Sequence, residues 1–114
     1  MTRQKRQLIY DRFSGRCAYC GNHIELKDMQ VDHIVPKRMG GTDDINNLYP
    51  ACRRCNHYKR AEPLKVFRRM MLTLHERIRQ NYICRVAEDY GILEVREWDG
   101  RFYFEKLQQK EEIH

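Results

Sequence analysis

The chain has 114 residues, of which 41% are hydrophobic and 33% are charged, and its formal net charge is +6 at pH 7. This length suits one domain with a modest core and is short of two. No apolar run approaches roughly 18 residues, the length that a membrane helix needs, and the basic N-terminus leads into no signal-peptide segment, so we expect neither membrane insertion nor export.

The positive charge is concentrated in the first half of the chain. Residues 1–60 hold 12 basic residues (Lys and Arg) against 6 acidic residues (Asp and Glu), whereas residues 61–114 hold 10 basic and 10 acidic residues. A basic field attracts polyanions, and nucleic acid is the commonest such partner. A solvated basic surface without a ligand explains the charge about equally well.

The first predicted element is a helix over residues 3–13, with Thr2 as its N-cap and Gly15 as its stop. Its apolar face is expected to comprise Leu8, Ile9 and Phe13. A tight turn over residues 17–21 follows, because two cysteines in this segment are separated by only two residues.

A hairpin and a helix are predicted next. Residues 30–35 alternate and are rich in β-branched side chains, which indicates a strand that ends at Pro36. Glycines and an Asp/Asn cluster predict a loop over residues 36–47, followed by a short return strand at 48–49. A helix is expected over about 53–61, since proline at 63 disfavours a helical residue before it.

The pattern changes beyond residue 63. Apolar residues recur at helical spacing over 64–74, and a second helix is expected over about 76–90. Asp99-Gly100 between two β-rich segments predicts a terminal β-hairpin over 92–104. We therefore expect an α+β fold, with a core at residues 1–62 and a helical and hairpin extension at 63–114 packed on it as one domain.

Five cysteines are present, and four of them form two Cys-x-x-Cys pairs: Cys17, Cys20, Cys52 and Cys55. Four thiolates complete a tetrahedral shell for Zn²⁺ and leave no position for water, which is typical of a structural site. An odd count and tight pairs favour metal binding in a reducing cytoplasm over disulfides. Cys84 lies in an apolar stretch and is predicted to be a small buried core residue.

The insertion between the two pairs carries the candidate chemistry. A plain zinc ribbon has about 15–20 residues between its pairs, whereas 31 residues separate Cys20 from Cys52 in this chain. This insertion contains Asp32-His33-Ile34-Val35-Pro36, Gly40-Gly41 and Asn47-Leu48, and the second pair continues as Cys55-Asn56-x-x-Lys59. With these motifs, residues 8–61 resemble the HNH endonucleases, the ββα-metal or His-Me finger nucleases.

The resemblance implies a zinc-stabilised ββα-metal core and metal-dependent hydrolysis of DNA. His33 would be the general base that activates water, since imidazole titrates near neutral pH. Asp32 and Asn56 would hold one Mg²⁺, Mn²⁺ or similar divalent ion through oxygen atoms. Asn47 would fix the loop and orient His33 through its backbone.

One position departs from the family pattern. Many members carry histidine directly after the last cysteine, whereas in this chain Asn56 takes that place and His57 follows. Adjacent helical residues point about 100° apart, so only one of them is expected to face the ion, and Asn56 is preferred over His57. The residues expected to contact DNA phosphates lie beside this site and are Lys37, Arg38, Arg53, Arg54, Lys59 and Arg60.

Two other classes of function remain open from the sequence. A non-catalytic zinc-ribbon module would bind DNA and use Asp32 and His33 only structurally, and a thiol redox protein would not hold zinc tightly. The expected setting is the cytoplasm of a bacterial host, with either a bacterial or a phage gene. Residues 63–114 could in addition contact a protein partner or form a homodimer.

Overall fold

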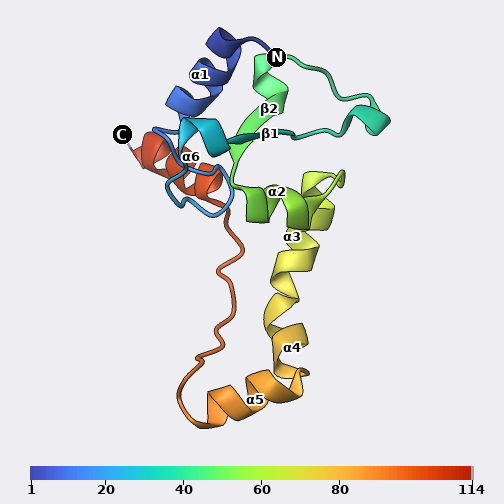
Figure 1. Cartoon of the computed structure of the whole chain (residues 1–114), viewed down its shortest axis with the longest axis vertical. Coiled ribbons are helices and arrows are strands. Elements are labelled where there is room, and N and C mark those ends of the chain that lie inside the picture. The colour runs from blue at the N-terminus through green and yellow to red at the C-terminus, as the bar shows by residue number, and fades with distance from the viewer. Residues whose placement is uncertain (114) are drawn as a thin grey trace. The chain divides into compact units, whose positions relative to one another are not determined.

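The computed structural model describes residues 1–113, which form two compact units (Figure 1). The first unit comprises residues 1–64 together with the C-terminal segment from Phe102, and the second comprises residues 65–101. The last segment of the chain thus belongs to the same unit as the first 64 residues. No helix within the described residues is long and apolar enough to cross a membrane.

Helix α1, Arg3–Arg12, begins as predicted, because the Thr2 side chain accepts a hydrogen bond of 3.1 Å from the backbone N–H of Lys5. The helix ends in a turn whose N–H groups bond back to the last helical carbonyls. Ile9 and Phe13 are buried, but Leu8 is 54% exposed. The apolar face of α1 is therefore narrower than predicted.

Strands β1, Gln30–His33, and β2, Leu48–Ala51, form an antiparallel pair. Asp32 lies opposite Tyr49, and His33 lies opposite Leu48. β1 ends two residues earlier than predicted, while β2 continues two residues further, through Pro50. Proline is tolerated because a two-stranded sheet consists of edge strands, whose outward N–H groups need no partner. Short 3-10 helices lie at Leu26–Asp28, Lys37–Met39 and Ile45–Asn47.

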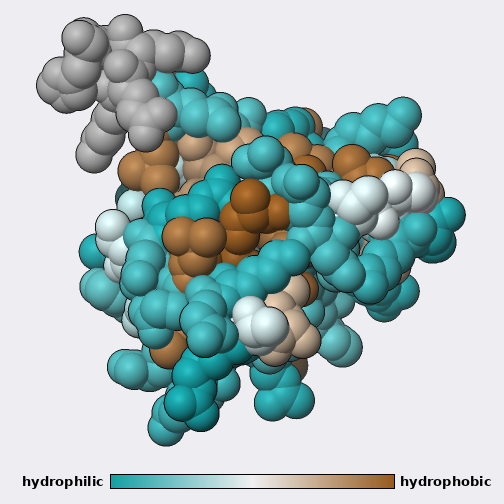
Figure 2. Space-filling model, turned by 90° about the horizontal axis from the view of Figure 1, so that it is seen from above, coloured by the Kyte–Doolittle hydropathy of each residue, from teal (hydrophilic) through white to brown (hydrophobic). Residues whose placement is uncertain are grey.

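Two small cores hold the first unit together. Ile9, Met29 and Leu48 form an aliphatic core between α1 and the hairpin. Aromatic rings form the other, with centroids of Tyr19 and Phe102 5.4 Å apart and those of Tyr49 and Phe104 4.9 Å apart. The face drawn in Figure 2 is mostly hydrophilic, with smaller hydrophobic areas between the polar side chains.

Helix α2, Arg53–Lys59, follows β2 directly and is two residues shorter than predicted. Arg60 ends it with φ 58° and ψ −149°. This backbone region is occupied almost only by glycine, and a side chain there costs of order 1–3 kcal/mol. The end of α2 is therefore a strained position beside the loop that leads to the second unit.

The prediction of a C-terminal β-hairpin over residues 92–104 is wrong. Within the described residues, 92–102 contain no strand, and helix α6, Tyr103–Ile113, begins where the second strand was expected. The chain does bend at Gly100, where the side chain of Asp99 accepts a hydrogen bond of 3.0 Å from the N–H of Arg101. Two aromatic residues of the predicted second strand, Phe102 and Phe104, are instead buried in the first unit.

The C-terminal segment is attached through its backbone as well as its rings. The N–H groups of Tyr103 and Phe104 donate to the carbonyls of Tyr19 and Ala18 at 2.9 and 2.8 Å. Figure 1 shows α6 beside the loop that follows α1, although the two segments come from opposite ends of the chain. Tertiary packing has overridden the local strand propensity.

The second unit is helical, with most of α3, Leu64–Leu72, followed by α4, Leu74–Arg79, and α5, Tyr82–Asp89. The single helix predicted over 76–90 is interrupted because Asn81 caps α5, accepting a hydrogen bond of 3.2 Å from the N–H of Cys84. Cys84 is only half-buried, so its assignment to the core is wrong. Several apolar side chains of this unit are largely exposed, namely Tyr82, Ile83, Tyr90 and Ile92.

Candidate active site and metal centre

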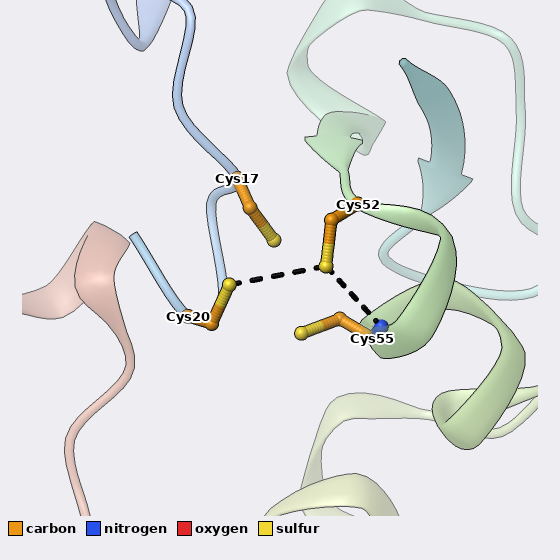
Figure 3. A group of neighbouring side chains, drawn as sticks. All are labelled: Cys17, Cys20, Cys52 and Cys55. Atoms are coloured by element: carbon orange, nitrogen blue, oxygen red, sulfur yellow. Dashed lines mark hydrogen bonds between the residues drawn. The ribbon is translucent and has the colours of Figure 1, made fainter. Parts of the chain in front are cut away.

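The four paired cysteines lie together, with their sulfur atoms pointing toward one another (Figure 3). These atoms all lie within 4.8 Å of each other, and Sγ of Cys20 is 3.8 Å from Sγ of Cys52. A tetrahedral site with Zn–S bonds of about 2.3 Å separates neighbouring sulfurs by about 3.8 Å. The cluster therefore has the size and the donor set of a structural zinc site.

The backbone around the first pair aims its sulfurs at this centre. Gly21 adopts φ 79°, and its N–H donates to the carbonyl of Cys17 at 3.0 Å. The N–H of Asn22 points at Sγ of Cys20 at 3.5 Å. A Cβ at Gly21 would lie 2.9 Å from the ring of Tyr103, so both the turn and the approach of α6 require glycine. In the second pair, Cys52 caps α2 through its sulfur.

The crowded sulfurs perturb each other electrostatically. A hydrogen bond from the Cys55 thiol lowers the pKa of Cys17 to about 5, and the same bond raises the pKa of Cys55. Burial raises the pKa of Cys20 to about 11. A single thiolate is thus stabilised by its neighbouring thiols, whereas four thiolates in this volume would need a cation, which links metal binding to folding.

Asp32 and His33 occupy the end of β1, where the alternation of a strand separates their side chains. Asp32 is buried and His33 is partly exposed. Two groups hold the carboxylate of Asp32: Tyr19 donates its hydroxyl to Oδ2, and Nζ of Lys59 lies 3.1 Å from the same oxygen. Nζ of Lys59 also lies 3.4 Å from Oδ1 of Asp32 and 3.4 Å from the carbonyl of His33.

The partners of Asp32 both come from segments that the cysteines anchor. Tyr19 stands between Cys17 and Cys20, and Lys59 is in the helix that carries Cys55. Burial, and then the charge of Asp32, raises the pKa of Tyr19, so the phenol stays protonated and acts as a donor. The cysteine cluster and the carboxylate of Asp32 are therefore connected through short stretches of chain.

His33 has one carboxylate partner. Its Nε2 lies 2.7 Å from Oδ1 of Asp43, and Nζ of Lys37 lies 3.3 Å from the same oxygen. The hydrogen bond to His33, followed by the one to Lys37, lowers the pKa of Asp43. Nζ of Lys5, on α1, donates to the backbone carbonyl of Asp43.

Asn47 closes the loop between β1 and β2. Its side-chain amide accepts a hydrogen bond of 2.9 Å from the N–H of Val35 and donates to the carbonyls of Val35 and Thr42 at 3.2 and 2.8 Å. Its own carbonyl accepts from the N–H of Ile34 at 2.9 Å. Asn47 thus binds the chain just after His33 to the loop that carries Asp43.

A glycine makes this loop compact. The N–H of Gly41 donates to the carbonyl of Pro36 at 3.0 Å. A Cβ on Gly41 would lie 1.7 Å from the carbonyl oxygen of Val35, which no side chain can do without moving the backbone. Gly41 therefore keeps the loop close to the end of β1.

A cleft of about 380 Å³ brings three of the four candidate catalytic residues together, whereas Asn47 does not line it. Asp32, His33 and Asn56 all line it, as do the basic residues Lys37, Arg38 and Arg60. Carboxylate and amide oxygens are donors that hard divalent cations prefer. The cleft therefore combines a candidate base, oxygen ligands for a cation and positive charge for an anionic substrate.

The remaining predicted site residues have different positions. His57 is exposed and does not line the cleft, whereas Asn56 does. Arg53 and Arg54 are exposed in the first turn of α2, and Arg38 bonds the carbonyl of Ala61 at 2.9 Å. Lys59 is completely buried. Its ammonium group is directed at Asp32 and offers no surface for a phosphate, so the structure gives it a different role.

Two residues at this site, Tyr19 and Asp43, were not identified from the sequence. No periodic sequence pattern could identify Tyr19 as a site residue, since it lies inside the tight turn of the first cysteine pair. Asp43 belongs to the Asp/Asn cluster that indicated a loop. The folding of that loop, which Asn47 closes, brings the carboxylate to His33.

Comparison with known proteins gives a consistent result. Residues 17–62 match the family model described as HNH endonuclease. The chain is 39% identical over 57 residues to the CRISPR-associated endonuclease Cas9 of Corynebacterium diphtheriae, covering 49% of this chain. It is 34% identical over 64 residues to the SPbeta prophage-derived putative HNH endonuclease YoqL of Bacillus subtilis, covering 46% of this chain.

A solved structure shows the same similarity. The Type II-C Cas9 enzyme from Actinomyces naeslundii superimposes with a TM-score of 0.54 and 28% identity, over 67% of this chain and 10% of that one. The chain spans only 5% of the Corynebacterium relative and 26% of YoqL. The similarity therefore concerns a domain of these proteins and not their whole length.

Proposed function

We propose that this chain is a metal-dependent endonuclease that hydrolyses phosphodiester bonds in DNA, because residues 17–62 match the HNH endonuclease family model. The observation that carries the proposal is the cleft in which Asp32, His33 and Asn56 meet. A module that only binds DNA has no need to place an imidazole, a carboxylate and an amide in one basic cleft.

In the proposed reaction, His33 takes a proton from a water molecule as the water oxygen attacks phosphorus. The bond between phosphorus and the 3′ oxygen breaks, that oxygen takes a proton from solvent, and the phosphate stays on the 5′ end of the product. His33 then releases its proton to solvent. Asp32 and Asn56 would hold a divalent ion such as Mg²⁺ or Mn²⁺. When bound, that ion would act as a Lewis acid toward the negative charge on the phosphoryl oxygens.

The contacts of Asp32 support its role in holding the ion. Tyr19 and Lys59 both bond Oδ2 of Asp32, and Nζ of Lys59 lies closer to Oδ2 than to Oδ1. Oδ1 therefore has the weaker protein contact, at 3.4 Å from Nζ of Lys59. A carboxylate held in one orientation keeps its second oxygen in a constant position. Lys59 also bonds the His33 carbonyl and so contributes to the placement of both residues.

We further propose that the cysteine cluster binds one Zn²⁺ in a structural role. The sulfur spacing and the closed set of four thiolates support this assignment, because no position is left for a catalytic water. Thiolates persist where cysteines stay reduced, which fits the cytoplasm of a bacterial cell. The zinc would hold the segments of Tyr19 and Lys59, and through them Asp32, in place.

DNA would lie along the basic rim of the cleft. Lys37, Arg38 and Arg60 line the cleft itself, and Arg53 and Arg54 are exposed nearby on α2. Lysine and arginine at such positions bind phosphates without reading sequence. We therefore propose low sequence preference for this domain acting alone.

The test is cleavage of supercoiled plasmid by the purified, zinc-loaded chain. With Mg²⁺ or Mn²⁺ we expect nicked or linear products whose ends carry 5′ phosphate, and no cleavage in excess chelator that spares the zinc. DNA binding without cleavage under any divalent ion would support the zinc-ribbon binding module instead. Linear, single-stranded and branched substrates in the same assay would define the preferred DNA structure.

A further inference from the structure

The carboxylate of Asp43 makes the most direct contact with the candidate base. Nε2 of His33 lies 2.7 Å from Oδ1 of Asp43, a distance typical of a strong, charge-assisted hydrogen bond. Among residues 1–108, whose side chains the structure describes, the His33 ring has no second hydrogen-bond partner. Within this part of the chain, Nδ1 of His33 therefore contacts no protein group by a hydrogen bond.

Asp43 is held in place from three directions. Lys5 of α1 donates to its backbone carbonyl, and Lys37 contacts both carboxylate oxygens, at 3.3 and 3.4 Å. Asn47 fixes the preceding residue by donating to the carbonyl of Thr42 at 2.8 Å. These contacts hold Asp43 in place although its side chain is 57% exposed.

The chemistry of the pair determines which ring nitrogen can act as a base. A carboxylate only accepts hydrogen bonds, so the nitrogen that faces it must carry the proton. In a neutral imidazole the other nitrogen then carries the lone pair. A carboxylate on Nε2 thus leaves Nδ1 able to accept a proton from water.

We propose that Asp43 is a positioning residue that holds His33 in the Nε2–H tautomer and presents Nδ1 to the attacking water. This proposal rests on the proposed nuclease function, in which His33 is the base. In this proposal Asp43 acts through His33. When the ring accepts a proton, the adjacent carboxylate stabilises the imidazolium, while Lys37 keeps the carboxylate oriented.

The proposal is tested by the ¹⁵N chemical shifts of the His33 ring, which separate the two neutral tautomers. The full chain is labelled with ¹⁵N-histidine, zinc-loaded and free of DNA, and the His33 signals are assigned with His33→Gln. Wild type should show the Nε2–H pattern, and Asp43→Ala should show a mixture of tautomers. Asp44→Ala is the matched control, because Asp44 caps the next turn through the N–H of Asn46 at 2.9 Å and does not contact His33.

Kinetics provide the second readout. Asp43→Ala should lower kcat by about 10–100-fold, the usual effect of removing a residue that orients a functional histidine. KM should not rise, because the substitution removes a negative charge from the DNA-binding side. Asp44→Ala should retain a kcat close to that of wild type.

The two readouts separate failure of this proposal from failure of the proposed function. An Asp43→Ala protein with the wild-type ring spectrum would overturn the positioning role, whatever the activity. An effect on KM alone would overturn it as well. If wild type shows the Nε2–H pattern, lost in Asp43→Ala, but cleaves no DNA, the positioning role stands and the nuclease function falls.

Discussion

Lys59 is the residue whose substitution tests the architecture of the site most severely. Its side chain is fully buried, and that of Asp32 is only 6% exposed, with 3.1 Å between Nζ and Oδ2. At an effective dielectric constant of about 20, two unit charges at this distance attract by about 5 kcal/mol. Lys59→Met keeps the volume and removes the charge, leaving the Asp32 carboxylate with Tyr19 as its remaining partner.

Breaking a buried ion pair by removing one partner typically costs about 3–5 kcal/mol, and we expect Lys59→Met to lower the free energy of unfolding by that amount. Urea denaturation of the zinc-loaded chain, followed by far-UV circular dichroism, measures the change. Adding Asp32→Asn should restore most of the loss, because the amide keeps an acceptor for Tyr19 and removes the unpaired charge.

Lys37→Met is the matched control for this experiment. Lys37 also pairs with an aspartate, but its side chain is 64% exposed. Surface ion pairs contribute at most about 1 kcal/mol, so this variant should unfold close to wild type. If Lys59→Met cost less than about 1 kcal/mol, or no more than Lys37→Met, the buried pair would be the wrong description of Asp32.

Three further predictions concern zinc, DNA and backbone strain. Elemental analysis should find one zinc per chain, and the zinc content should be unchanged in Cys84→Ser. Removal of the zinc by a chelator should unfold the first unit. Native protein that contains no zinc would contradict the assignment of the four cysteines as a zinc site. DNA affinity should fall steeply with salt, and Arg38→Gln should reduce the slope of log K against log salt by about 1, whereas a flat salt dependence would exclude phosphate binding. Arg60→Gly should raise the unfolding free energy by about 1 kcal/mol by relieving the positive φ, yet weaken DNA binding; a loss of stability would show that the backbone is not strained.

The parts of the site determined by short-range chemistry were predictable from the sequence. The two Cys-x-x-Cys pairs predicted a four-sulfur cluster, and the structure brings the four sulfurs within 4.8 Å of one another. The alternating segment before Pro36 correctly indicated the strand that carries Asp32 and His33. Asn56 lines the cleft and His57 does not. Adjacent helical residues point about 100° apart, which is why only one of the two was expected to face the site.

Contacts between segments distant in sequence were not predictable in the same way. Tyr19 and Asp43 reach the site only after the turn and the loop have folded. Lys59 could have been placed inward, since it lies three and four residues after Asn56 and Cys55 on the same helical face. The C-terminal aromatics showed a strand pattern, yet ring packing against Tyr19 and Tyr49 determines their structure.

Cleavage by His33→Ala tests the central claim most directly. A positioned general base contributes about 10²–10⁴-fold, so the variant should lose activity by that factor under Mg²⁺ or Mn²⁺. Zinc content, folding and DNA affinity should stay near wild type, because the imidazole contacts neither the cysteines nor the phosphates. Cleavage by His33→Ala at the wild-type rate would contradict the mechanism.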